Sequence, residues 1–242
     1  MIKIPKHDTY RIIKIALALA LLLAAILLTE WVVSGDSLKL DKMLILAMRD
    51  LSDPANPIGP GWLEESARDI TALGGIPILT LVTIFLATYL WMGGDYRAVM
   101  FIALVVIGAL LLSFGLKHLI GRPRPDLVSH GTQVYSLSFP SSHAMMSAAI
   151  YYAMGLLARE SLVLRRRRIN AVFFLAVLIV LIGVSRVYLG VHWPTDIVAG
   201  WILGVLWVQA SLLIVRQYGD SRTALIVSRS AERNAKGGIS DY

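Results

Sequence analysis

The sequence Ser-Arg-Val-Tyr-Leu-Gly-Val-His-Trp-Pro-Thr-Asp, at residues 185–196, lies between two long apolar runs. It places Arg186, His192 and Asp196 in a short break of an otherwise apolar chain. Ionisable side chains are costly at a membrane boundary, so they are candidates for a functional site. His192 and Asp196 are four residues apart and would share one face of a helix beginning here, whose first turn tolerates Pro194. A carboxylate behind an imidazole fixes its tautomer and leaves the other ring nitrogen free to attack or to bind.

The composition predicts an integral membrane protein with an all-α fold. Of the 242 residues, 57% are hydrophobic and only 16% are charged, and the mean hydropathy is +0.68. A soluble domain could not bury so much apolar side chain, so we expect one membrane domain over residues 1–242. The net charge of +7 would suit nucleic acid, but in a membrane protein it indicates cytoplasmic loops rich in Lys and Arg. The absence of cysteine excludes disulfides and thiolate metal sites.

Apolar stretches predict a bundle of six transmembrane helices. They cover residues 12–33, 76–91, 99–116, 142–157, 171–189 and 195–215. A cleavable signal peptide is the alternative for the first stretch, but its apolar region would have only ~7–15 residues before a small-residue cleavage site. The longer run, which continues as Leu-Leu-Thr-Glu-Trp, favours a retained helix. Residues 1–11 and 217–242 are then cytoplasmic tails, and the Lys-Gly-Gly segment at 236–238 is expected to be disordered.

The longest polar connection, residues 34–73, separates the first and second stretches. Residues 41–51 are amphipathic, and residues 62–73 follow a run rich in Pro and Gly. Both segments predict short interfacial helices. They would either cover a site at the membrane surface or form a plain interfacial loop, and the sequence leaves both open.

The charges of the connections orient the bundle. The 34–73 connection carries seven acidic residues (Asp36, Asp41, Asp50, Asp53, Glu64, Glu65 and Asp69) against four basic ones (Lys39, Lys42, Arg49 and Arg68). The run of four arginines at 165–168 falls on the opposite side. By the positive-inside rule the arginine run is cytoplasmic and the 34–73 connection faces out.

Two further polar segments fall on the same outer side as residues 185–196. One is Lys-His-Leu-Ile-Gly-Arg-Pro-Arg-Pro at 117–125, and the other is Pro-Ser-Ser-His at 140–143. Taken in order, three patterns resemble signature motifs: Lys, six intervening residues and Arg-Pro; Pro-Ser-x-His; and Ser-Arg, five intervening residues, His, three intervening residues and Asp. They are the motifs of the type 2 phosphatidic acid phosphatase (PAP2) family, relatives of the vanadium haloperoxidases. The resemblance covers roughly residues 70–216.

The resemblance implies a role for each matched residue. His192 would be the nucleophile that takes a phosphoryl group, oriented by Asp196, and His143 the general acid for the leaving group. The phosphate would be bound by basic side chains and by the start of the fourth span, at Lys117, Arg124, Ser141, Ser142 and Arg186. Such cations and free helix N–H groups suit a phosphate. The scheme needs no metal or other cofactor, and the sequence shows no carboxylate cluster with metal-ligand spacing.

One matched position departs from the family pattern, which usually reads Pro-Ser-Gly-His. Ser142 keeps the backbone N–H that glycine would offer and adds a hydroxyl, so a phosphate cradle is compatible with it. His118, Arg122, Asp126 and His130 lie near the motifs but outside the matched positions. We expect them to contact loops or headgroups, with Arg122 as the first candidate for a substrate contact.

Together these features predict a phosphatase acting on a lipid phosphate or pyrophosphate at the outer leaflet of a bacterial inner membrane. The candidate substrates are undecaprenyl pyrophosphate, phosphatidylglycerol phosphate, phosphatidic acid and the phosphates of lipid A; membrane lipids are the expected partners, and nucleic acid is not. A lipid-phosphate binding or transport protein is the alternative, although transporters tend to show internal repeats and broken helices near the midplane. A soluble haloperoxidase-type enzyme is a third possibility, which the six apolar stretches disfavour. The sequence does not indicate an oligomeric state.

Overall fold

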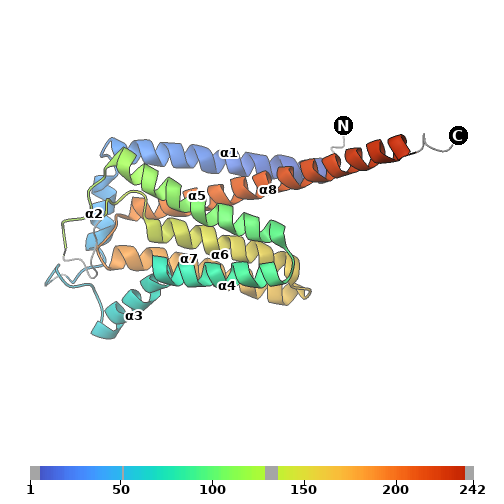
Figure 1. The fold of residues 1–242 in the computed structure, drawn as a ribbon. Coiled ribbons are helices and arrows are strands. Elements are labelled where there is room, and N and C mark those ends of the chain that lie inside the picture. The colour runs from blue at the N-terminus through green and yellow to red at the C-terminus, as the bar shows by residue number, and fades with distance from the viewer. Residues whose placement is uncertain (1–5, 51, 129–135, 238–242) are drawn as a thin grey trace.

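The computed structural model describes residues 6–50, 52–128 and 136–237, and its regular structure there is helical (Figure 1). Strand-like pairing within these residues is limited to an isolated bridge between Arg49 and Pro57. The predicted all-α fold is confirmed. The helices are α1 (Lys6–Val33), α2 (Leu38–Leu46), α3 (Gly61–Ala72), α4 (Ile76–Met92), α5 (Tyr96–Ile120), α6 (Ser142–Ser161), α7 (Arg165–Tyr188) and α8 (Pro194–Gly237).

Helix α6 is the centre of the bundle and packs against α5, α7 and α8. Its side chains Met145, Ala149, Ile150 and Ala153 are almost completely buried in the main apolar core. Small residues let α8 approach it closely, since a Cβ added to Gly204 would lie only 2.6 Å from the carbonyl oxygen of Met145. This contact sets the N-termini of α6 and α8 side by side, and both carry motif residues.

Four helices are long and apolar enough to cross a membrane, at residues 15–33, 96–120, 165–188 and 194–217. Helices α3 and α4, bent by 44° at their junction, add a fifth candidate if they are taken as one span. The protein is therefore a helical membrane protein with four to five candidate spans by length and composition, fewer than the six predicted. Helix α6 is not among these candidates because its polar residues lower its hydropathy. It tolerates them because it lies at the centre of the bundle and faces protein rather than lipid.

The two short helices predicted between the first and second spans are present as α2 and α3. Helix α2 packs on the start of α8, and α3 packs on α7. Figure 1 shows both at the same end of the bundle as the connection between α5 and α6. The 34–73 connection therefore covers the bundle end where the polar motifs lie.

Helix α8 is longer than the predicted span of 195–215. It continues as far as Gly237 and projects beyond the other helices (Figure 1). Lys236 and Gly237, predicted to be disordered, are helical, because α8 continues without a break through the polar segment. Gly238 lies outside the described residues.

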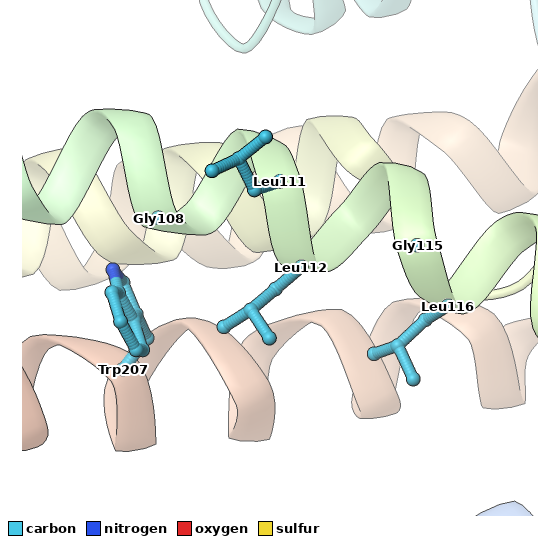
Figure 2. Close-up of a pocket in the computed structure, with 6 residues that line it drawn as sticks. All are labelled: Gly108, Leu111, Leu112, Gly115, Leu116 and Trp207. Carbon is cyan, nitrogen blue, oxygen red and sulfur yellow. The ribbon is translucent and has the colours of Figure 1, made fainter.

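An apolar groove between α5 and α8 has a volume of about 380 Å³ (Figure 2). It is lined by Gly108, Leu111, Leu112, Gly115, Leu116 and Trp207. The indole of Trp207 lies against Gly108, where an added Cβ would come within 1.9 Å of the ring, and its N–H points to the carbonyls of Leu104 and Val105 at 3.1 Å. None of the lining residues is ionisable, so this groove is a packing feature of the helix pair and not the site of the chemistry.

Candidate active site

The three polar motifs meet at one end of the bundle because four helices end or begin there. Lys117 is in the last turn of α5 and Arg186 in the last turn of α7, whereas His143 opens α6 and Asp196 opens α8. The N–H of Ser141 donates to the carbonyl oxygen of Asp196 at 3.1 Å, which joins the second and third motifs directly. Residues that are far apart in the sequence are thus brought together by antiparallel helix packing.

His192 and Asp196 form the pair that their spacing predicts. Nδ1 of His192 lies 3.4 Å from Oδ2 of Asp196, and both side chains are almost fully buried. The same carboxylate oxygen accepts hydrogen bonds from the hydroxyl of Ser138 at 2.5 Å and from the N–H of Trp193 at 3.1 Å. Because Ser138 Oγ also lies 3.3 Å from His192 Nδ1, the imidazole has two oxygen partners on that side.

The other ring nitrogen of His192 faces a cation. Nη1 of Arg124 lies 3.1 Å from His192 Nε2 and also donates to the carbonyl of Val191 at 2.6 Å. A guanidinium can only donate, so Nε2 must accept and carries the lone pair. The proton of the neutral ring is then on Nδ1, where Asp196 and Ser138 can receive it. This tautomer leaves Nε2 as the nucleophilic nitrogen.

The pKa of His192 is held well below its ordinary value. Burial is the main cause, because it disfavours the charged imidazolium. The nearby positive charges of Arg124, Arg186 and Lys117 lower the pKa further. His192 is therefore a neutral imidazole at neutral pH, which is the form required of a nitrogen nucleophile.

The three predicted phosphate-binding cations lie close enough to His192 to lower its pKa, but their hydrogen-bond partners differ. Nζ of Lys117 donates to the carbonyl of Leu137 at 2.5 Å. Arg124 donates through Nε to the carbonyl of Ser136 at 2.6 Å, and Arg186 donates to the hydroxyl of Thr71 at 3.1 Å. Among the described residues, Nε of Arg186 has no hydrogen-bond partner. Lys117 and Arg186 are buried, so an anion bound here would meet little competing water.

Ser141 and Ser142 have separate roles at the start of α6. Ser141 is the N-cap, and its hydroxyl accepts from the N–H of Ala144 at 3.5 Å. The hydroxyl of Ser142, at the position where the family pattern has glycine, lies 2.8 Å from the hydroxyl of Ser113 on α5. The extra hydroxyl is therefore directed toward the α5–α6 contact.

His143 faces the bend between α3 and α4. A Cβ added to Gly75 would lie 3.8 Å from His143 Nε2, and one added to Gly74 would lie 3.5 Å from its Cδ2. At either position an added Cβ would make only an ordinary van der Waals contact with the imidazole. The edge of the imidazole therefore lies beside the junction between α3 and α4.

Arg122 does not lie where a substrate contact was expected. It is buried and bridges two carboxylates, with Nη1 2.6 Å from Asp196 Oδ1 and Nη2 2.7 Å from Asp41 Oδ2. Asp41, on α2, also accepts from the N–H and the hydroxyl of Thr195, at 3.0 and 2.8 Å. Asp126 is exposed, His118 packs edge-on against Phe114, and His130 lies outside the described residues.

The sequence reasoning missed three residues of this arrangement: Ser138, Asp41 and Thr195. Ser138 adjoins the second motif, and Thr195 precedes Asp196, so proximity to the motifs could have suggested both. Nothing in the spacing links position 41 to position 196. Asp41 could be found only once the fold had placed α2 against α8.

Comparisons with known proteins agree with the motifs. A family model described as the PAP2 superfamily matches residues 98–220. Phosphatidylglycerophosphatase B of Bacillus subtilis (strain 168) is 34% identical over 164 residues, which cover 64% of this chain and 77% of the relative. Lipid A 1-phosphatase of Rhizobium johnstonii is 32% identical over 139 residues, covering 53% and 50%. A crystal structure of a transmembrane PAP2-type phosphatidylglycerolphosphate phosphatase from Bacillus subtilis is similar with a TM-score of 0.70 and 26% identity, covering 84% of this chain and 96% of the other.

Proposed function

The chain belongs to the PAP2 superfamily and is a membrane lipid phosphatase, and we propose that it transfers the phosphoryl group of its lipid substrate to His192. The observation that carries this proposal is the contact between Arg124 and His192 Nε2, because it assigns the lone pair to the nitrogen that faces the cations. A phosphorus atom bound among Lys117, Arg124 and Arg186 would meet that lone pair directly.

In the first step His192 Nε2 forms a bond to phosphorus while the bond from phosphorus to the leaving oxygen breaks. The leaving oxygen takes a proton from His143, and the three cations stabilise the charge that develops on the phosphoryl oxygens. Water then attacks the phosphohistidine, gives a proton to His143 and releases inorganic phosphate. Asp196 holds the Nδ1 proton of His192 throughout, which stabilises the positive charge of the phosphorylated ring.

We propose a substrate whose hydrocarbon tail stays in the bilayer and whose phosphate reaches the end of the bundle. Phosphatidylglycerol phosphate is the first candidate because of the similarity to the phosphatidylglycerophosphatase of Bacillus subtilis. Undecaprenyl pyrophosphate, phosphatidic acid and the phosphates of lipid A complete the panel. Phosphate release from each lipid in detergent micelles tests the function. Failure of all four lipids to release phosphate would contradict this choice of substrates and favour the alternative of a lipid-phosphate binding or transport protein.

The proposed mechanism uses no metal ion. Among the described residues, no group of three His, Asp or Glu side chains could hold one. We therefore expect hydrolysis to continue at an unchanged rate in EDTA and to be inhibited by vanadate, which resembles the phosphoryl group in transfer. The measurement is phosphate release with chelator, with chelator plus excess magnesium, and with vanadate. Activity that is lost in EDTA and restored by magnesium would contradict the metal-free mechanism.

We also propose that the protein crosses the membrane six times, with α4 and α6 as additional spans. The 17 residues of α4 would measure about 26 Å and the 20 residues of α6 about 30 Å, close to the ~30 Å of a bilayer core. An even number of spans puts both termini on one side. The motifs then lie on the opposite side from the arginines at 165–168, facing the periplasm or the exterior of a bacterial inner membrane.

Cysteine labelling tests this orientation, because the chain has no cysteine of its own. Ser52, in the 34–73 connection, and Ser161, at the end of α6, are both exposed serines. We expect a Ser52→Cys variant to react with a membrane-impermeant maleimide in intact cells. A Ser161→Cys variant should react only after the membrane is permeabilised. The reverse pattern, or labelling of both variants in intact cells, would overturn the topology.

A further inference from the structure

Asp41 on α2 and Arg122 after α5 lie outside the three motifs but are built into the catalytic pair. We infer that they are positioning residues for Asp196 and His192, so that the 34–73 connection is a working part of the active site. This inference rests on the proposed function, because it concerns the orientation of the proposed nucleophile.

The contacts form a continuous chain from α2 to the imidazole. Arg122 donates through Nη2 to Asp41 Oδ2 and through Nη1 to Asp196 Oδ1. Oδ1 of Asp196 is thereby occupied, and Oδ2 is the oxygen left to face His192. The planar guanidinium fixes the angle between the two carboxylates, which a lysine ammonium could not do.

Asp41 acts on Asp196 by a second route as well. Its Oδ1 accepts from the backbone N–H of Thr195, and its Oδ2 accepts from the Thr195 hydroxyl, which also receives a hydrogen bond from Arg122. Thr195 directly precedes Asp196 in the first turn of α8. Asp41 therefore contacts both Arg122, which pairs with Asp196, and the backbone of Thr195 next to Asp196.

Burial makes this pairing strong and specific. Asp41 and Asp196 are fully buried, and Arg122 is 6% exposed. The two buried carboxylates share the guanidinium of Arg122, which also donates hydrogen bonds to the hydroxyls of Ser37 and Thr195. The hydroxyl of Ser138 donates to Asp196. Removing one charged partner would leave the others to find new contacts, which would turn Asp196 away from His192.

Arg49 provides a matched comparison in the same connection. It is also a buried arginine, and it ties the connection to the bundle through the carbonyl of Tyr188 at 2.8 Å. Within the part of the chain that the structure describes, Arg49 forms no ion pair with a carboxylate and no hydrogen bond with His192 or Asp196. Loss of Arg49 should loosen the connection without changing the orientation of Asp196.

The test compares Asp41→Asn and Asp41→Ala with Arg49→Met in the full-length protein, on the same lipid phosphate. Asp41→Asn keeps the size and an acceptor for Thr195 but removes the charge that holds Arg122, so it should fold even if Asp41→Ala does not. We expect Asp41→Asn to lower kcat by about 10- to 100-fold, as for residues that orient a catalytic ligand, with KM within about threefold. Arg49→Met should lower the melting temperature and leave kcat within about threefold of wild type.

The outcomes separate the two proposals. A kcat of Asp41→Asn at the wild-type value, or an equal fall of kcat in Arg49→Met, would show that Asp41 is only structural and would overturn the positioning role alone. If wild-type protein releases no phosphate from any lipid of the panel, the proposed function fails and the positioning role fails with it.

Discussion

Replacing His192 with alanine is expected to lower kcat on a lipid phosphate by at least about 10⁴-fold, because the variant has no nitrogen to form the bond to phosphorus. The fold should survive. Asp196 keeps its hydrogen bonds from Arg122, Ser138 and the N–H of Trp193 when the imidazole is removed. The loss should therefore appear in turnover and not in the yield or the melting temperature of the protein in detergent.

His118→Ala is the matched control for this experiment. His118 also lies at the end of the bundle where the motifs meet, in the last turn of α5, but it is exposed and packs edge-on against Phe114. We expect its kcat to stay within about threefold of wild type, as for surface substitutions. Activity of His192→Ala within tenfold of wild type would remove His192 from the role of nucleophile.

The phosphoenzyme itself can be measured. Wild-type protein mixed with substrate labelled in the phosphate and quenched in alkali should retain label that acid releases, as expected for a phosphorus–nitrogen bond. The His192→Ala variant should retain none. Label retained equally by both proteins would place the intermediate on another residue.

The sequence predicted which polar residues come together better than it predicted the membrane crossings. His192 and Asp196 could be paired because a spacing of four residues has a fixed meaning at a helix start. Lys117 and His143 could be placed at span ends because apolar stretches end next to them. These local rules hold here because each residue lies at the end of a helix, so its position can be predicted without knowing the contacts between distant segments.

What the sequence could not predict depends on contacts between distant segments. Arg122 was expected near substrate because its charge and its position beside Arg124 fit that role equally well. Only the approach of α2 to α8, which brings Asp41 within 2.7 Å of Arg122, shows that the guanidinium is already shared by two carboxylates. The polar residues of helix α6 are likewise explained only by its contacts with other helices. They weaken any hydropathy signal, although the burial of α6 among α4, α5, α7 and α8 allows them.

Replacing His143 with alanine is expected to lower kcat/KM on a lipid phosphate by about 10²- to 10⁴-fold, the usual contribution of a general acid. The alkoxide of a lipid alcohol is a poor leaving group, so its departure depends on a proton. His143 can supply that proton from the first turn of α6. His192 and its partners are unchanged in this variant, so the nucleophile remains.

The loss should therefore depend on the leaving group. Nitrophenolate leaves as a stable anion without a proton, so His143→Ala should hydrolyse nitrophenyl phosphate much closer to the wild-type rate. The measurement is the ratio of kcat/KM between variant and wild type on the lipid phosphate and on nitrophenyl phosphate, with His192→Ala as the reference that loses both. A binding or transport protein would show no such difference, since neither histidine would touch a bond that breaks. Equal losses on the two substrates would instead assign His143 to holding the phosphate, beside Lys117 and Arg186, and would leave the leaving-group proton to another donor.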